Sequence, residues 1–247
     1  MRIAVFCEAA DDFAIATGLI DRVLYDEGPS WLREYVEARP CSDLREWVGP
    51  GPDRPFFDVH HIYKEARARG IVLPRNRFAE RRGGPGALMA YTAYLVAREE
   101  AWRSGPVDAL VLVWDMDDQG DARREGLAEG RAIGLLPMLV GCPDMEREAW
   151  VLAGFEPENA NEREKLEQER KNLGFEPHRE AHRLRDKDDR APRSPKRVLS
   201  SLTGDDRERE SRCWTDVPLD TLRARGDGSG LRAYLEEIRE RLLPLWR

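Results

Sequence analysis

A chain of 247 residues is long enough for one large domain, or for a compact domain with an appendage. Charged residues make up 35% of it, so we expect a strongly solvated segment beside the core. The net charge of −7 argues against a protein that coats nucleic acid by bulk electrostatics, but a carboxylate metal site would bind cations that this figure omits, so nucleic acid is not excluded as a substrate.

The apolar runs and the cysteines indicate a cytoplasmic protein. The first apolar run, residues 2–7, is followed at once by acids, unlike a secretory signal. The longest apolar-rich stretch, 87–97, is far shorter than the roughly 20 residues that cross a bilayer. Four scattered cysteines without a CxxC pair suit reduced, partly buried thiols. We therefore expect no membrane contact.

The elements expected in chain order follow a strand-then-helix rhythm. Three apolar runs lead through polar or acidic residues into helical patterns: 3–7 into 11–25, 109–114 into 121–136, and 138–142 into 144–152. A fourth, one-sided strand is expected at 56–63, and a helix that begins with proline at 85–103. This rhythm predicts an α/β fold with a mainly parallel sheet flanked by helices.

Composition divides the chain into three parts. Residues 1–155 contain the expected strands and form the α/β core. Residues 156–193 are almost all charged or polar, which predicts a charged helical arm or insertion. Residues 194–247 form a C-terminal helical segment that packs on the core, because 230–243 has an apolar stripe at helical spacing. Residues 49–55 and 75–86 are expected to be loops.

Acidic side chains follow two of the expected strands. The buried run 110–114 ends in Asp115 and Asp117, and the run 3–7 ends in Glu8. Ligands of open parallel sheets bind at the carboxyl ends of strands, so neighbouring strands would bring these carboxylates together. Such a cluster is costly without a cation, and oxygen ligands favour Mg²⁺ or Mn²⁺. The alternative is that these acids only cap the helices that follow.

The order of these motifs resembles the Toprim domain. Glu8 and Asp12 are similar to the two acids of its opening motif, although Ala9 replaces the usual glycine, and Asp115 and Asp117 resemble its DxD strand end. Glu148, in a segment with Trp150, resembles a later acidic helix. The motifs resemble those of OLD-type nucleases and of small stand-alone Toprim proteins of prokaryotic anti-phage defence.

The resemblance implies a Mg²⁺- or Mn²⁺-dependent nuclease that hydrolyses phosphodiester bonds of nucleic acid. It gives Glu8, Asp115 and Asp117 metal-binding and catalytic roles. It makes Asp12, Asp121 and Glu148 candidates for a second metal or its surroundings, while Asp121 as a helix cap and Glu148 as a solvated helix residue stay open. Lys196 would stabilise charge developing on the phosphate, unless it is an ordinary surface lysine.

Residues 179–197 contain eight Lys or Arg and four acids, an excess that suits a phosphate backbone. We expect Arg190, Arg193, Lys196 and Arg197 to contact nucleic acid, and a merely solvated face is the alternative.

Other functions remain open at this stage. The domain would instead be a catalytically weak sensor or assembly module, with a protein partner such as an ATPase or as a homo-oligomer. A DxD phosphatase with an aspartate nucleophile is a weaker alternative. His60 and His61 are interpreted as strand histidines rather than as metal ligands, and His178 and His182 as surface residues of the arm.

Overall fold

The computed structural model describes residues 1–33, 44–51, 53–117 and 119–246. The described chain divides into two compact units, and each is considered by itself. The first unit comprises residues 1–141 and 237–247, and the second comprises residues 142–236. These divisions do not coincide with the boundaries expected at residues 155 and 193. Cys41 lies outside the described residues, whereas Cys7, Cys142 and Cys213 are buried and not in disulfides.

A parallel sheet forms the centre of the first unit. Its strands are β1 (Arg2–Cys7), β2 (Glu46–Val48), β3 (Phe57–Asp58), β4 (Ala109–Val113) and β5 (Met138–Gly141). The strand order is β2-β1-β4-β5, β3 also pairs with β1, and these described strands all pair in parallel. The expected α/β class with a mainly parallel sheet is confirmed.

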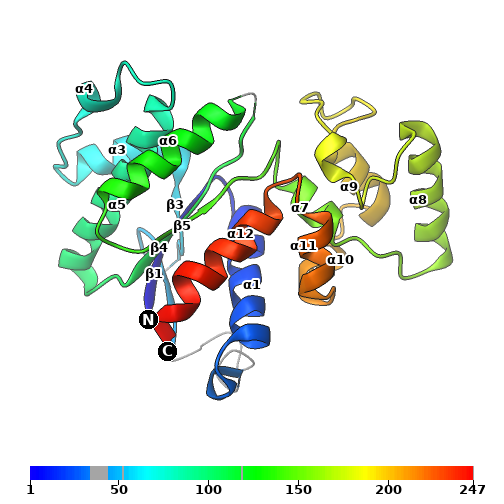
Figure 1. Ribbon diagram of the computed structural model, residues 1–247, viewed down its shortest axis with the longest axis horizontal. Coiled ribbons are helices and arrows are strands. Elements are labelled where there is room, and N and C mark those ends of the chain that lie inside the picture. Colours follow the sequence, from blue (N-terminus) through cyan, green and yellow to red (C-terminus); the bar gives the residue numbers. More distant parts are fainter. Residues whose placement is uncertain (34–43, 52, 118, 247) are drawn as a thin grey trace. The chain divides into compact units, whose positions relative to one another are not determined.

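Helices cover both faces of this sheet. Figure 1 shows α5 (Gly84–Ser104) and α6 (Gly120–Ile133) on one side and α1 (Ala10–Glu27) on the other. Because both faces are covered, β4 is buried along its whole length, as its continuous apolar run predicts. At Gly126, a Cβ atom would come within 1.9 Å of the Gly83 carbonyl oxygen, so glycine is what lets α6 approach the start of α5 so closely.

The expected strand at 56–63 is wrong beyond its first residues. β3 ends at Asp58, because the Asp58 carboxylate accepts a hydrogen bond from the His60 N–H and turns the chain into a 3-10 turn, Val59–His61. Helix α3 (Ile62–Ala68) follows. The apolar spacing that suggested a longer strand buries Val59 and Ile62 in these turns instead. A short helix, α4 (Arg75–Phe78), lies within the loop expected at 75–86.

The second unit is built from short helices. They are α7 (Glu148–Ala153), α8 (Ala160–Leu173), α9 (Pro195–Thr203), α10 (Arg207–Thr215), α11 (Leu219–Arg225) and most of α12 (Leu231–Glu237). Its core contains Trp150, whose ring stacks on Tyr234 at 5.0 Å between centroids. The Trp150 indole N–H also donates to the Ser229 carbonyl oxygen.

The segment expected as a charged arm is folded into this unit. Asn159 caps the start of α8 by accepting from the Glu162 N–H, and Gly174 ends the helix in a left-handed conformation. Three of its large apolar residues, Leu173, Phe175 and Leu184, are buried rather than isolated on a surface. A few buried apolar residues, too sparse to form a period in the sequence, therefore help to fix this segment.

Two buried ion pairs complete the packing of the segment. Arg209 makes a two-pronged pair with Glu162, and Arg197 makes another with Glu169. Both carboxylates are at least nine-tenths buried at the side chain. Charged residues that composition assigns to solvent thus serve as internal contacts. Among all described helices, none has the length and apolar character needed to span a membrane.

Candidate metal site at the sheet edge

The strand register brings the predicted acids to one edge of the sheet. Phe6 of β1 lies opposite Leu112 of β4, and both strands run in the same direction. Continuing this register for the next residues places Glu8 beside Trp114, immediately before Asp115. Glu8 and the Asp115–Asp117 turn therefore emerge at the carboxyl edge of the sheet, where ligands of open parallel sheets bind.

Glu8 lies in a partly buried, negatively charged environment. Its side chain is 24% exposed. Burial is the largest influence on its pKa and raises it, and the nearby carboxylates of Asp12 and Asp117 raise it further. His60, with Nε2 3.6 Å from the Glu8 carboxylate, and Arg123 act in the opposite direction without cancelling the rise. The structure thus brings Glu8, Asp12 and Asp117 within electrostatic reach of one another.

Arg123, from the first turns of α6, provides positive charge at this edge. Its guanidinium donates to the Asp117 carboxylate at 3.1 Å and to the backbone oxygen of Asp115. It also lies 4.0 Å from the centre of the Trp114 ring, a cation–π contact. Its side chain is only 11% exposed. Arg123 therefore acts as a built-in counter-ion for the acidic edge, a residue that the sequence interpretation missed.

Asp117 has a backbone conformation that few residues adopt. Its φ of 47° lies in the left-handed region, which Asp and Asn tolerate better than other residues with a side chain. This turn directs its carboxylate to Arg123. The next residue, Asp118, lies outside the described residues.

Asp12 and Asp121 occupy different environments. Asp12 is 7% exposed and accepts a hydrogen bond from the Ala9 N–H at 2.9 Å, which closes the first turn of α1. Its charge still acts on Glu8. Asp121 has a side chain that is 77% exposed and pairs with Arg124 at 2.8 Å. Asp12 therefore borders the acidic edge, and Asp121 serves the surface of α6.

The side chains of the acidic edge offer the type of ligand atom that a hard cation prefers. Glu8, Asp12 and Asp117 supply carboxylate oxygens, the ligand type that Mg²⁺ and Mn²⁺ prefer. Within the ranges that the structure describes, however, no three His, Cys, Asp or Glu side chains are grouped closely enough to hold a metal ion. Arg123 contributes positive charge to this edge instead. A cation would have to compete with Arg123 for Asp117.

Histidines beside the edge differ from the sequence interpretation. His60 and His61 lie in the 3-10 turn after β3 rather than in a strand, and both are exposed. The His61 Nδ1 atom lies 2.7 Å from the Asp58 carboxylate. Burial acts to raise the pKa of Asp58, but hydrogen bonds from His61 and the His60 N–H outweigh it and lower the pKa. The His61 ring is therefore held in one orientation.

Lys196 and Glu148 belong to the second unit. Lys196 contacts the Glu146 carboxylate at 3.1 Å and the Asp189 carboxylate at 3.7 Å. Burial acts to lower the pKa of Lys196, and the hydrogen bond with Glu146 outweighs it and raises the pKa. Glu148 is 8% exposed and pairs with Arg147 at 2.8 Å, so the reading of it as a solvated helix residue is wrong.

The expected nucleic-acid contacts are not alike. The Arg197 guanidinium donates to the Glu169 carboxylate and to the Pro192 carbonyl oxygen. Its charge is therefore neutralised within the second unit. Arg190 and Arg193 are exposed. His178, expected at the surface, is instead 6% exposed because it packs into the folded segment, and burial lowers its pKa.

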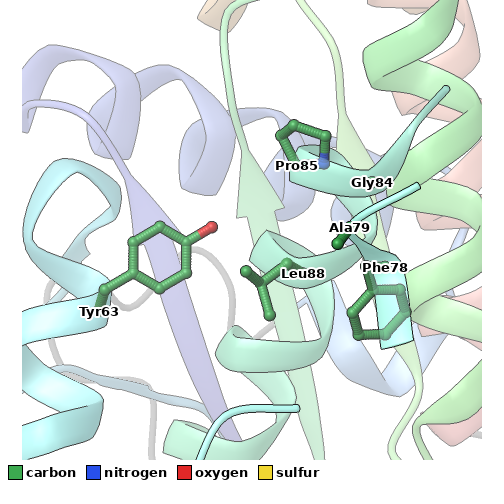
Figure 2. A pocket seen from close by; sticks show the side chains of 6 residues that line it. All are labelled: Tyr63, Phe78, Ala79, Gly84, Pro85 and Leu88. Carbon is green, nitrogen blue, oxygen red and sulfur yellow. The ribbon is translucent and has the colours of Figure 1, made fainter. Parts of the chain in front are cut away.

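An apolar cavity of about 320 Å³ lies elsewhere in the first unit. Figure 2 shows Tyr63 of α3 on one side of it and Leu88, Phe78 and Ala79 on the other. Among the side chains that the structure describes, none that lines it is charged, and the hydroxyl of Tyr63 is its polar group. Its lining does not provide the charge or the acid–base groups that the sheet edge provides.

Comparison with known proteins identifies no relative: no protein-family model, no curated protein and no solved structure matches this chain.

Proposed function

We propose that this protein hydrolyses phosphodiester bonds of nucleic acid with the help of Mg²⁺ or Mn²⁺ held at the acidic sheet edge. The observation that carries the proposal is the partly buried Glu8, whose pKa is raised by burial and by Asp12 and Asp117. Keeping repelling carboxylates together in a half-buried place is costly unless a cation binds there. A parallel sheet's carboxyl edge is also the usual place for a ligand.

The residues of the edge have separable roles in this proposal. Glu8 and Asp117, with Asp115 beside them, would hold the cation, and Asp12 would border it while closing the first turn of α1. A bound divalent ion supplies an activated water and stabilises the leaving oxygen. Arg123 would leave the Asp117 carboxylate while remaining bonded to the Asp115 backbone oxygen, and its planar fork suits a phosphate group.

Protonation of Glu8 would compete with the metal. Because the pKa of Glu8 is raised above its ordinary value, this carboxylate takes up a proton at a higher pH than an exposed glutamate. Metal binding is therefore expected to weaken as the pH falls, earlier than it would at an exposed carboxylate site.

The resemblance to Toprim proteins supports the choice of nucleic acid and of a role in anti-phage defence in the cytoplasm. Among the basic residues, Arg190 and Arg193 are the exposed candidates for contact with the phosphate backbone. Lys196 stays a proposed catalytic lysine, and its ion pair with Glu146 gives it a defined position within the second unit.

The deciding experiment is cleavage of plasmid DNA and of RNA with Mg²⁺ or Mn²⁺, by the wild type and by Asp117→Asn. Asp121→Asn is the matched control, because it makes the same change in charge two residues before Arg123 at an exposed, surface-paired carboxylate. We expect Asp117→Asn to be inactive and Asp121→Asn to be active. Equal cleavage by both variants would remove the metal site from the reaction.

A second candidate is a metal-sensing or assembly module with little catalytic activity, with a protein partner such as an ATPase or as a homo-oligomer. It is favoured by the lack, among described side chains, of a three-residue group that could hold a metal, and by the presence of Arg123 at the acidic edge. Calorimetry that shows Mg²⁺ binding dependent on Asp117, without cleavage of any substrate, would favour this function.

A further inference from the structure

We propose that a second, polar cavity in the first unit binds a phosphate group. The cavity has a volume of about 400 Å³ and lies between the loop after β2, the end of β3 and helix α3. Its polar lining consists mainly of side chains that carry or share positive charge, with two carboxylates: Arg54, Asp58, His61, Lys64 and Glu65.

Both carboxylates of the lining are already engaged. Asp58 accepts from the His60 N–H with one oxygen and meets His61 Nδ1 with the other. Glu65 accepts from Arg69 at 2.7 Å. Their negative charge is therefore shared with partners in the protein, and it opposes an anionic ligand less than two free carboxylates would.

The two long cations of the lining have no such partners. Neither Arg54 nor Lys64 forms an ion pair or side-chain hydrogen bond with any described residue, and both are exposed. Most arginines described in this chain are paired, so two unpaired cations at one cavity are unusual for it. A free guanidinium and a free ammonium on the same cavity wall suit the oxygens of a phosphate group.

His61 adds a third donor with a fixed direction. Since Nδ1 is held by Asp58 at 2.7 Å, Nε2 is the ring nitrogen that remains for a ligand. In the imidazolium form Nε2 donates a hydrogen bond, which suits a phosphate oxygen. The Asp58 carboxylate orients the ring, in the way that a carboxylate orients a histidine in other sites.

The cavity lies next to the acidic sheet edge. Asp58 is the register partner of Cys7, the residue before Glu8. In the turn that follows, His60 contacts the Glu8 carboxylate, whereas His61 lines the cavity. A phosphate in the cavity would therefore be a neighbour of a cation at Glu8. Assigning it to a nucleic-acid substrate rests on the proposed function, but phosphate binding itself does not.

The test measures phosphate binding by the full chain in EDTA, so that no metal contributes. Calorimetric titrations would use inorganic phosphate, a 5′-phosphorylated tetranucleotide and the same tetranucleotide without that phosphate. Lys64→Gln and Arg54→Gln are each expected to weaken the binding of phosphate-bearing probes roughly tenfold, the effect of losing one charge-assisted hydrogen bond. His61→Gln should weaken it too.

Arg67→Gln is the matched control. Arg67 lies on the same helix, is exposed and does not line the cavity, so its removal changes net charge equally. The affinity of Arg67→Gln for the phosphate-bearing probes should stay within about twofold of the wild-type affinity, as expected for the loss of a surface charge. Unchanged binding in Lys64→Gln and Arg54→Gln, or an equal loss in Arg67→Gln, would overturn the proposal. Urea unfolding verifies that every variant is folded.

The probes also separate the possible sources of the phosphate. Tighter binding of the 5′-phosphorylated tetranucleotide indicates a terminal phosphate, and equal binding of the two tetranucleotides, weakened by Lys64→Gln, indicates an internal phosphodiester. Both outcomes support the cavity as a phosphate site. If the protein binds phosphate through Lys64 but cleaves no nucleic acid, the proposed function fails and this inference stands. If it cleaves nucleic acid while Lys64→Gln binds phosphate normally, this inference alone fails.

Discussion

Replacing Arg123 with methionine tests whether this arginine is the internal counter-ion of the acidic edge. The change keeps an apolar chain of similar length but removes the hydrogen bonds to the Asp115 backbone oxygen and the Asp117 carboxylate, and the contact with Trp114. Hydrogen bonds to charged groups contribute about 1.5–3 kcal/mol and a cation–π contact about 0.5–2 kcal/mol. Since these terms overlap, we expect a loss of about 2–4 kcal/mol in the free energy of unfolding without metal.

Magnesium should restore this stability. Without Arg123, Glu8 and Asp117 repel each other with less compensation, and a cation no longer competes with a guanidinium for Asp117. Arg123→Met should therefore bind Mg²⁺ more tightly than the wild type, and a ligand at a hundredfold excess over its Kd adds about 2.7 kcal/mol. The assay is urea unfolding in EDTA and in Mg²⁺, followed by calorimetric titration of the metal.

Arg124→Met is the control for this experiment. Arg124 is the next residue of α6, and it pairs with Asp121 at the surface, where both side chains are about half exposed or more. Such a pair contributes about 0–1 kcal/mol. Equal losses in the two variants, or a Mg²⁺ effect no larger in Arg123→Met than in the wild type, would show that Arg123 is not the counter-ion of a metal site.

Three further predictions follow from single contacts. Asp117→Asn should stay within about 1 kcal/mol of wild-type stability, because asparagine tolerates a φ of 47° and the Asp117 side chain in the lost ion pair is about half exposed. Its cleavage activity should fall at least about a hundredfold. Urea unfolding measures the first effect and gel assays the second, and an active variant would contradict the metal role. Since the pKa of Glu8 is raised in the folded state, its contribution to stability is complete below its ordinary pKa and is lost as the pH rises through the folded value. Glu8→Gln should therefore gain stability relative to the wild type in EDTA as the pH rises above the ordinary pKa of a glutamate, and urea unfolding that shows a constant difference as the pH is raised would contradict the shift. Arg209→Met should lower the free energy of unfolding by about 3–5 kcal/mol, because it leaves the buried Glu162 carboxylate without its ion-pair partner, and adding Glu162→Leu should recover most of this loss. Arg170→Met breaks an exposed pair and should lower it by less than about 1 kcal/mol in the same urea experiment. Similar losses for both variants would mean that burial does not determine the cost of breaking the pair.

The sheet was predictable because its strands are buried on both faces. The apolar runs at 3–7, 109–114 and 138–142 predict buried strands, and β1, β4 and β5 lie within one residue of these bounds. The short strand β2 was missed, since three residues, one of them exposed, carry no period that a sequence pattern reveals.

The second unit was not predictable from composition. Residues 156–193 suggested a solvated arm because charge dominates them, yet Glu162 and Glu169 are buried through arginines more than 25 residues away along the chain. Such partners become visible only when the chain is folded. The buried Leu173 and Leu184 are apolar residues that could have indicated a folded segment, but both are too isolated in the sequence to form a helical or strand period.

The acidic site was predictable in part. Strand ends followed by acids indicated that Glu8 and Asp117 share an edge, and their mutual effect on the pKa of Glu8 is in line with that prediction. Arg123 was missed because it begins no motif, although an arginine six residues after Asp117 on the following helix was a usable signal. The histidines were misread because the strand that was expected to hold them ends at Asp58.

Negative charges at the sheet edge and positive charges at the polar cavity flank the turn that follows β3. Glu8, Asp12 and Asp117 carry three negative charges, which Arg123 offsets only in part. Arg54 and Lys64 line the cavity to which Asp58 also contributes. They are positive charges without ion-pair partners among the described residues. In the turn between the two sets of charge, His60 contacts the Glu8 carboxylate and His61 lines the cavity. A ligand that carries both signs, a phosphate group together with its divalent cation, is complementary to both sets at once.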